Sequence, residues 1–424
     1  MGKPFPSQGK AVITYTKGVM VTDTSQASIE RFLERGVETV YPSKDALVKA
    51  LKSGKQLSFY LGADPSRPDL HIGHAVILRR MKVLQEMGHR VIFLIGDFTG
   101  MIGDPTDKSA ARTQMTHEQV LENAQTYKQQ IKKILSFTGD NPAEIVFNSK
   151  WLSKLKFEDL IHLASKFTVQ QMIERDMYQN RLNEGKPIYL HEFFYPLMQG
   201  YDSVAMEVDG EFGGSDQLFN MMAGRTLMRE LIGKEKFVIT GQLLLGTDGR
   251  KMSKSYNNYV GISDTPKDMY GKIMSIQDEL IEDYFKLCTS ADMGEINEIH
   301  LMLAKGSTNP RDFKMQLAKL ITREYHGDDA SAAAEAGFIS QFQKGIQPAD
   351  IPELNVGKPG NTLVDVLMAT DMAGSRGEAK RLIQQGGVKI NGKPSGNEPN
   401  QIIEASARPV LQVGKLKYVR VLPE

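Results

Sequence analysis

Cysteine, net charge and long apolar runs are all scarce in this chain. A single cysteine, Cys288, stands in 424 residues, which excludes an internal disulfide and suits a reducing compartment. The net charge is only +1, so any surface that attracts nucleic acid must be local. No apolar run approaches membrane-spanning length, and the opening MGKPFPSQGK lacks the apolar core of a secretory signal. We therefore expect a cytoplasmic globular protein with no membrane partner.

Strand and helix patterns alternate between about residues 56 and 260. The expected elements are a strand over 56–62, a helix over 75–88, and strands over 90–96 and 236–241. Gly88 is the expected end of the helix. Because a strand, a helix and a second strand follow in order, we expect a parallel sheet with right-handed crossovers. The predicted fold class is α/β, with a Rossmann-like domain over residues 1–260.

The remainder of the chain divides into a helical part and a small tail. Residues 261–344 carry helical patterns, and Asn309 followed by Pro310 is a suitable cap and first turn. Residues 345–360 are rich in proline and glycine, which predicts a linker. Residues 361–424 then predict a small α+β domain.

Two histidines stand three residues apart in GADPSRPDLHIGHAV, residues 62–76. Zinc-binding helices use histidines four apart with a glutamate between them, so a metal pair at His71 and His74 is disfavoured. A pair of structural histidines at a helix start is the plain alternative. The pair follows a predicted strand and opens a helix, however, and parallel sheets bind ligands at that position. We therefore expect the imidazoles to donate hydrogen bonds to phosphate oxygens, with Gly73 admitting a base or ribose.

The second motif is KMSKS, in the stretch LLLGTDGRKMSKSYNNYV at residues 243–260. Taken alone, Lys251 and Lys254 could belong to an ordinary solvated loop. HIGH and KMSKS together, in this order and about 180 residues apart, resemble the two signatures of class I aminoacyl-tRNA synthetases. Attack of a carboxylate on the α-phosphate of ATP needs alignment of two anions and stabilisation of the leaving pyrophosphate. The predicted catalytic side chains are His71, His74, Lys251 and Lys254.

Further stretches resemble one branch of that class, the tyrosyl-tRNA synthetases of bacterial type. They are FYLGADPS before HIGH, IGDFTGMIGDPTDKSAART, FFYPLMQGYDSV and FGGSDQLFNMMAGR. The resemblance implies that Tyr60 and Asp202 hold the phenol oxygen of tyrosine. It implies that Asp104, Tyr195 and Gln199 bind the amino group and that Gln217 faces the carboxylate.

The same resemblance implies an ATP site. The implied ATP-binding positions are Gly62, Asp64, Ser66, His71, Gly73, His74, Gly214, Asp216, Lys251, Lys254 and Ser255. Lys108 and Arg112 match positions that handle the triphosphate. Members of the family work as homodimers, which implies an inserted dimerisation segment at about residues 110–195.

The residues themselves support part of this site. Tyr195, Gln199 and Asp202 are spaced four and three apart, so on a helix they share one face. That polar face is flanked by apolar residues, which favours a pocket over solvated surface. A buried aspartate facing a phenol would reject phenylalanine, because phenylalanine would leave the carboxylate unpaired.

The tail resembles a small RNA-binding fold known from a ribosomal protein. Residues 361–424 hold nine basic and six acidic side chains, a net charge of +3. Arg376, Lys380 and Arg381 lie on successive turns of a predicted helix, and Lys389 flanks a predicted NG hairpin turn. We expect these four side chains to bind the tRNA backbone, with affinity that falls as salt rises.

Three functions fit the sequence. The leading one is ATP-dependent ligation of tyrosine to tRNA(Tyr) through tyrosyl-adenylate. The second keeps the nucleotide chemistry with another acid, as in the tryptophan enzyme or a small-molecule ligase. The third is a non-catalytic RNA-binding protein that has kept a synthetase body. For the first we expect ATP with Mg²⁺ as substrate, no metal held by the protein, and a homodimer.

Overall fold

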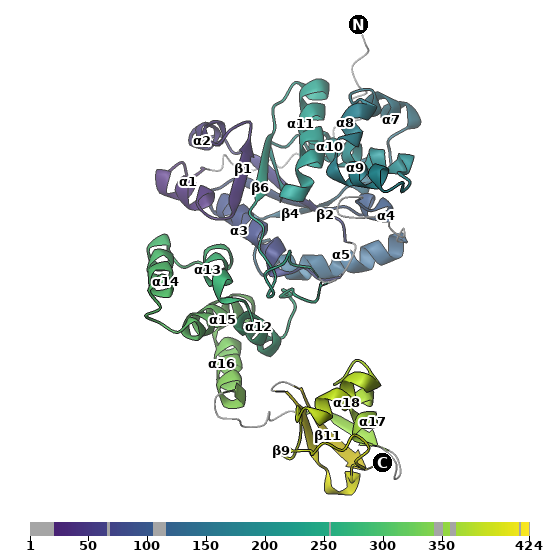
Figure 1. The fold of residues 1–424 in the computed structure, drawn as a ribbon. Helices are drawn as coiled ribbons and strands as arrows, with labels where there is room; N and C mark the ends of the chain where they lie inside the picture. Colours follow the sequence, from purple (N-terminus) through teal and green to yellow (C-terminus); the bar gives the residue numbers. More distant parts are fainter. Residues whose placement is uncertain are drawn as a thin grey trace. The chain divides into compact units, whose positions relative to one another are not determined.

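The computed structural model describes residues 21–65, 68–104, 116–253, 256–342, 351–356, 362–414 and 417–423. The chain divides into two compact units, Met1–Ser331 and Ala332–Glu424. Each unit is described by itself below, and Figure 1 labels their helices and strands. The finer division into four segments stays a prediction.

A six-stranded sheet forms the centre of the first unit. Its strands, in spatial order, are β1 (Val37–Tyr41), β6 (Phe237–Gly241), β5 (Gly210–Gly214), β2 (Ser58–Ala63), β3 (Arg90–Ile95) and β4 (Glu144–Phe147). All neighbours run parallel except β1, which pairs antiparallel with β6. The predicted α/β class with a parallel sheet is thereby confirmed. Three of these strands match the predicted ones to within two residues at either end.

The strands that follow β2 lie on both sides of it in the sheet: β3 and β4 on one side, and later β5 and β6 on the other. Helix α3 (Ile72–Glu86) connects β2 to β3, whereas α11 (Leu218–Ile232) connects β5 to β6 in the opposite direction along the sheet. Because parallel crossovers are right-handed, these two helices must cover opposite faces. Figure 1 shows this arrangement, with α10 (Tyr195–Met206) beside α11 and with α5 (His117–Ile131) beside α3. Strand order reverses between β2 and β5, which is where open α/β sheets bind ligands.

Local sequence accounts for the ends of α3. The helix begins three residues earlier than predicted, directly after His71, whose extended backbone (φ −119°) forms its N-cap. It ends before Gly88, whose φ of +86° favours glycine. A side chain at position 88 would also collide with the backbone oxygen of Val21. Its apolar face is buried against the sheet, including Leu78, Met81 and Leu84.

The other helices of this unit lie before β2, between β3 and α10, between β5 and α11, or after β6. The first groups are α1 (Gln26–Leu33), α2 (Lys44–Lys52), α4 (Thr99–Ile102), α6 (Ser149–Leu152), α7 (Phe157–Ala164), α8 (Val169–Ile173), α9 (Asp176–Asn183) and the 3₁₀ turns η1 (Leu190–Phe194) and η2 (Ser215–Gln217). After β6 come α12 (Pro266–Met274), η4 (Asp278–Leu280), α13 (Ile281–Cys288), α14 (Met293–Lys305) and α15 (Pro310–His326).

Two details of these helices bear on the predictions. Asn309 caps α15 as expected, since its side chain accepts a hydrogen bond of 3.0 Å from the backbone of Arg311. Within residues 110–195, the segment predicted for dimerisation, β4 belongs to the sheet and α5 lies in the crossover between β3 and β4. Residues 149–194 of that segment lie between β4 and α10, and their role in dimerisation stays a prediction. The four-residue strand EIVF was too short to recognise from its sequence.

The second unit contains a five-stranded sheet with two helices after α16 (Asp328–Phe342). The strand order is β7 (Glu353–Val356), β11 (Lys417–Pro423), β10 (Val410–Val413), β8 (Val388–Ile390) and β9 (Lys393–Pro394). Helices α17 (Leu363–Ala369) and α18 (Arg376–Gln384) pack on this sheet around a core of leucine, valine and isoleucine, and η5 (Ala405–Ala407) precedes β10. The NG turn is confirmed, with φ of +50° at Asn391 and +80° at Gly392. Residues 345–360, which the sequence predicts as a linker, contain β7, a short strand at the edge of this sheet.

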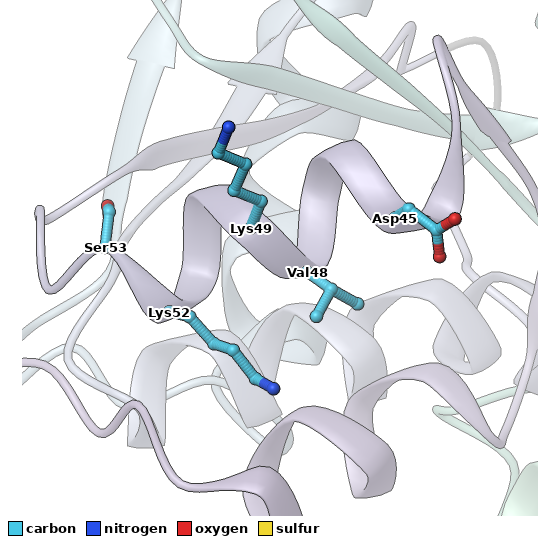
Figure 2. Close-up of a pocket in the computed structure, with 5 residues that line it drawn as sticks. All are labelled: Asp45, Val48, Lys49, Lys52 and Ser53. Carbon is cyan, nitrogen blue, oxygen red and sulfur yellow. The ribbon is translucent and has the colours of Figure 1, made fainter.

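Two surface properties complete the fold. In the part of the chain that the structure describes, no helix is both long and apolar enough to cross a bilayer. A surface hollow of about 520 Å³ is lined by Asp45, Val48, Lys49, Lys52 and Ser53 (Figure 2). All five come from α2 and the residue after it, and none is a predicted site residue.

Candidate active site

The start of α3, which carries the HIGH motif, lies beside the segment that follows KMSKS. The backbone N–H of Ile72 donates to Val260 O at 2.9 Å, and that of Ile262 donates to Leu70 O at 3.0 Å. The segment that follows KMSKS is therefore bonded to the start of α3. Two segments far apart in the sequence therefore lie together at the start of α3, the helix that follows β2.

The two histidines stack at this helix start. Their ring centroids are 3.8 Å apart, and His74 Nδ1 accepts a hydrogen bond of 3.2 Å from the backbone of His71. His71 is half-buried, whereas His74 is exposed. A Cβ on Gly73 would lie 2.9 Å from His71 Nδ1 and 3.5 Å from Met252 Sδ. A side chain at position 73 would therefore displace the imidazole of His71.

Lys251 connects KMSKS to the loop after β5. Its Nζ lies 3.4 Å from Asp216 Oδ2, and both side chains are exposed. Residues 248–253 are held by the buried side chain of Asn258. Its amide nitrogen donates to Lys251 O and Asp248 Oδ1, and its amide oxygen accepts from the backbone N–H of Ser253. Sequence reasoning missed Asn258, although it lies in the quoted stretch.

Of the other predicted ATP-binding positions, two lie at the ends of strands and several fall outside the described residues. Gly62 is exposed at the end of β2, and Gly214 ends β5, where a Cβ would lie 2.4 Å from Asp216 Oδ1. The positions outside the described residues are Ser66, Lys108, Arg112, Lys254 and Ser255.

Asp202 is a buried carboxylate that accepts hydrogen bonds from two side chains. Trp151 Nε1 donates to its Oδ1 at 2.7 Å, and Asn148 Nδ2 donates to its Oδ2 at 3.3 Å. The residue is 2% exposed, and burial raises its pKa well above the usual range for a carboxyl. Trp151 also packs against the cluster that contains Tyr60. Neither Trp151 nor Asn148 was found from the sequence.

Tyr60 is fully buried on β2, and its hydroxyl lies 2.9 Å from Ser203 Oγ. Ser203 Oγ also accepts a hydrogen bond of 2.9 Å from Lys236 Nζ. Lys236 forms an ion pair with Glu211, and Glu211 Oε1 accepts a hydrogen bond of 2.9 Å from Gln199 Nε2. Two predicted residues, Tyr60 and Gln199, are therefore joined by three residues that the sequence did not identify.

Tyr195 and Asp64 are joined directly. Tyr195 Oη donates to Asp64 Oδ2 at 2.8 Å, and Thr99 Oγ1 donates to Asp64 Oδ1 at 2.7 Å. Burial, followed by the charges of Asp64 and Asp104, raises the pKa of Tyr195 well above the usual value for a phenol, so Tyr195 stays protonated. The resemblance implies that Tyr195 binds the amino group of tyrosine and that Asp64 binds ATP. This hydrogen bond therefore joins a residue of the predicted tyrosine site to a residue of the predicted ATP site.

Asp104 and Gln217 form a second such contact. Gln217 Nε2 donates to Asp104 Oδ2 at 2.7 Å, and Gln217 Oε1 accepts from Asn220 Nδ2 at 3.1 Å. The Gln217 amide was expected to face a substrate carboxylate, but its donor is directed at Asp104 here. Tyr195, Gln199 and Asp202 share α10, as their spacing predicted.

The four predicted tRNA-binding side chains are exposed in the second unit. Arg376, Lys380 and Arg381 lie on α18, and Lys389 lies on β8. Arg376 pairs with Asp365. As for metals, the described ranges contain no group of three or more His, Cys, Asp or Glu that could hold an ion.

Two family models match this chain. One, described as tRNA synthetases class I (W and Y), covers residues 52–343, and a tyrosine–tRNA ligase C-terminal domain covers residues 341–421. A tyrosine–tRNA ligase of Photobacterium profundum is 47% identical over 401 residues, covering 93% of this chain and 99% of the relative. One from Carboxydothermus hydrogenoformans is 46% identical over 420 residues, covering 96% and 100%.

Solved structures agree on the fold. A C-terminally truncated mitochondrial tyrosyl-tRNA synthetase of Aspergillus nidulans matches with a TM-score of 0.63 at 22% identity, covering 75% of this chain and 95% of that one. A tyrosyl-tRNA synthetase of Archaeoglobus fulgidus, complexed with L-tyrosine, matches with a TM-score of 0.58 at 21% identity, covering 74% and 100%. At these identities the likeness extends to the fold alone.

Proposed function

Because this chain belongs to the tyrosyl-tRNA synthetases of class I, we propose that the residues assembled above activate tyrosine with ATP and transfer it to tRNA(Tyr). The observation that carries the proposal is the buried carboxylate of Asp202, which is held by Trp151 and Asn148; Trp151 also packs against the cluster that contains Tyr60.

The phenol end of tyrosine binds at Tyr60 and Asp202. A phenol hydroxyl carries one hydrogen and accepts others, so it suits an acceptor on one side and a donor on the other. Asp202 is the acceptor. Burial and the nearby charges of Glu211 and Asp202 raise the pKa of Tyr60 well above the usual value for a phenol, so Tyr60 keeps its hydrogen.

The amino acid's charged end binds among Asp104, Tyr195, Gln199 and Gln217. The amino group is a cation with three donors, and carboxylate, hydroxyl and amide oxygens suit it. The Nε2 of Gln217 turns from Asp104 to the substrate carboxylate once the amino group takes its place on Asp104. This exchange of partners reconciles the expected role of Gln217 with its observed contact.

ATP binds along the outer edge, over Gly62, Asp64, Gly214 and Asp216, with its phosphates against His71, His74 and Lys251. The side chains of His74 and Lys251 are exposed, as phosphate-binding groups must be to admit ATP. Ser66, Lys254 and Ser255 complete the assignment from the motifs alone. Mg²⁺ enters with ATP, because it binds phosphate oxygens and keeps several of its waters.

The acidic backbone of tRNA binds the basic tail. Lys380, Arg381 and Lys389 are exposed there, in a segment with a net charge of +3. The requirement for tRNA and ATP supports a cytoplasmic location.

The chain works as a homodimer through the part of residues 149–194 that carries exposed apolar side chains. Those side chains are Phe157, Ile161, Val169, Leu182, Tyr189 and Leu190, each at least 49% exposed. Phe157 and Ile161 lie one turn apart on α7, so they share one face, and such a face indicates a protein contact. Phe157→Asp with Ile161→Asp should yield a monomer by analytical ultracentrifugation, and an unchanged mass would contradict this interface.

Exchange of labelled pyrophosphate into ATP tests the activity. The expected result is exchange that depends on tyrosine, with tryptophan and phenylalanine giving far slower rates. Faster exchange with tryptophan would assign the chain to the sister specificity. Exchange with no amino acid would reject the catalytic proposal and leave RNA binding.

A further inference from the structure

A buried ion pair lies beneath the tyrosine site and has no role in the assignments above. Lys236 is 0% exposed and Glu211 is 1% exposed. Glu211 is the direct neighbour of Tyr60 across strands β2 and β5, and it is also the neighbour of Val238 on β6. Because Lys236 stands two residues before Val238, all three side chains lie on the face of the sheet that α10 and α11 cover. Burying two charges is costly, and replacing such pairs by apolar residues often leaves proteins equally stable, so a role besides stability is worth seeking.

The hydrogen bonds through Ser203 have a direction that Lys236 decides. An ammonium group only donates, so in its bond to Ser203 Oγ the serine accepts. Ser203 then has its own hydrogen to give, and the other group within 2.9 Å is the hydroxyl of Tyr60. When Ser203 donates to Tyr60, the hydrogen of Tyr60 is left for another acceptor: the carboxylate of Glu211, with which Tyr60 also interacts, in the empty site, and the phenol oxygen of tyrosine once it binds. Without Lys236, Ser203 could instead accept that hydrogen.

Glu211 acts in the same way at the other end of the site. Its Oε1 accepts from Gln199 Nε2, and its second oxygen holds Lys236. A carboxylate can only accept, so the Gln199 amide must turn its nitrogen toward Glu211. The oxygen of that amide is then directed away from the ion pair and can accept from an amino group.

The close packing of α10 against α11 restricts the space around the side chains of Lys236 and Ser203. A Cβ on Gly224 of α11 would lie 2.4 Å from Lys236 Nζ and 3.0 Å from Ser203 Oγ. The backbone of Gly224 also lies close to Gly200 of α10. The ammonium is thus held against Ser203 by two helices as well as by Glu211.

We propose that the Lys236–Glu211 pair is a positioning device that sets the hydrogen-bond direction at both ends of the tyrosine site. Lys236 donates to Ser203, Ser203 donates to Tyr60, and Tyr60 donates to the phenol oxygen of tyrosine, whose own hydrogen goes to Asp202. Glu211 orients Gln199 to receive the amino group. This inference rests on the proposed function, because it concerns how tyrosine is recognised.

The test neutralises the pair without leaving a buried charge, in the double variant E211Q/K236M. The amide oxygen introduced by E211Q can still accept from Gln199, but its NH₂ group can also donate. The variant therefore removes both the donor to Ser203 and the fixed direction of the hydrogen bond to Gln199. Tyr60 can then give its hydrogen to Ser203, and tyrosine loses a hydrogen bond worth about tenfold in affinity. In pyrophosphate exchange we expect kcat/KM for tyrosine to fall about tenfold, mainly through KM, with phenylalanine changed less than about twofold. The matched control K82M/E86Q neutralises an exposed pair on α3 and should change neither.

Adding S203A to the double variant separates direction from packing. Alanine cannot accept from Tyr60, so the triple variant should regain at least about threefold of the lost kcat/KM for tyrosine. Equal losses for tyrosine and phenylalanine, no loss in the double variant, or a further loss in the triple variant would each overturn the inference. If E211Q/K236M does not fold, as judged by circular dichroism, E211Q/K236L removes the same donor. Absence of exchange in the unaltered chain would instead overturn the proposed function.

Discussion

Replacing Asp202 with asparagine gives the sharpest prediction about substrate choice. Both groups that hold its carboxylate are donors, Trp151 Nε1 at 2.7 Å and Asn148 Nδ2 at 3.3 Å. Asparagine has one oxygen, which will take the shorter contact with Trp151. Its NH₂ group then faces Asn148 and the substrate, so the phenol meets a donor in place of an acceptor.

The size of the effect follows from the charge and the burial. Trp151 and Asn148 both donate to Asp202, which favours its ionised form against the opposing effect of burial. A hydrogen bond to a charged group contributes about 1.5–3 kcal/mol, and Asp202 is 2% exposed, so solvent does not replace it. Since about 1.4 kcal/mol corresponds to a factor of ten, kcat/KM for tyrosine should fall about 10- to 150-fold. Phenylalanine has no hydroxyl and makes no such hydrogen bond, so its kcat/KM should change less than about threefold.

Pyrophosphate exchange with each amino acid measures this directly. Asp97→Asn serves as the control, because Asp97 is also a buried aspartate but its carboxylate accepts a hydrogen bond of 2.9 Å from the backbone of Ser149. Its Tyr/Phe ratio should stay unchanged. If Asp202→Asn keeps the discrimination between tyrosine and phenylalanine, or if both substrates lose equally, the assignment of Asp202 to the phenol is wrong.

Three further predictions concern rate, stability and tRNA. Lys251→Ala should slow adenylate formation on the order of 100-fold while leaving tyrosine affinity within about threefold, and equal losses would contradict a transition-state role. Burial lowers the pKa of His89 from 6.5 to about 4, and the unfolded chain takes up the proton first, so stability should fall between pH 6.5 and 4. The free energy of unfolding, measured with urea, should fall between pH 6.5 and 4 by about 3 kcal/mol less in His89→Gln than in the unaltered chain. An identical pH dependence of the two proteins would refute this role of His89. Lys380→Ala with Arg381→Ala should lower the salt slope of tRNA binding by roughly 1.5 without changing pyrophosphate exchange, whereas an unchanged slope would exclude those side chains from the contact.

Local patterns were sufficient for the part of the fold that depends on neighbours in sequence. The strand before HIGH, the helix after it and the next strand follow from apolar runs and from Gly88, and the cap of α15 follows from Asn309 and Pro310. The helix face of Tyr195, Gln199 and Asp202 follows from spacing alone. Short edge strands could not be predicted in this way, because a four-residue strand such as β4 or β7 shows too little periodicity.

The buried network could not be predicted for a different reason. Lys236 precedes β6 in a charged stretch, GKEK, and such a lysine is ordinarily exposed. Its burial depends on Glu211 of a neighbouring strand, on Ser203 of α10 and on Gly224 of α11, which meet only in the folded chain. Trp151 is the chain's single tryptophan, yet nothing in its surroundings relates it to Asp202.

Burial changes from the phenol end of the proposed site to its phosphate end, and in the proposed mechanism this separates selectivity from rate. Tyr60 and Asp202 are 0% and 2% exposed, whereas His74, Asp216 and Lys251 are exposed. A dry phenol end makes each hydrogen bond strong and an unpaired group costly, which is what discrimination requires. An open phosphate end lets ATP enter, lets pyrophosphate leave and lets a lysine reach the phosphates as charge builds. Substitutions at the buried end should therefore change the ratio between amino acids, and those at the exposed end should change turnover for all of them.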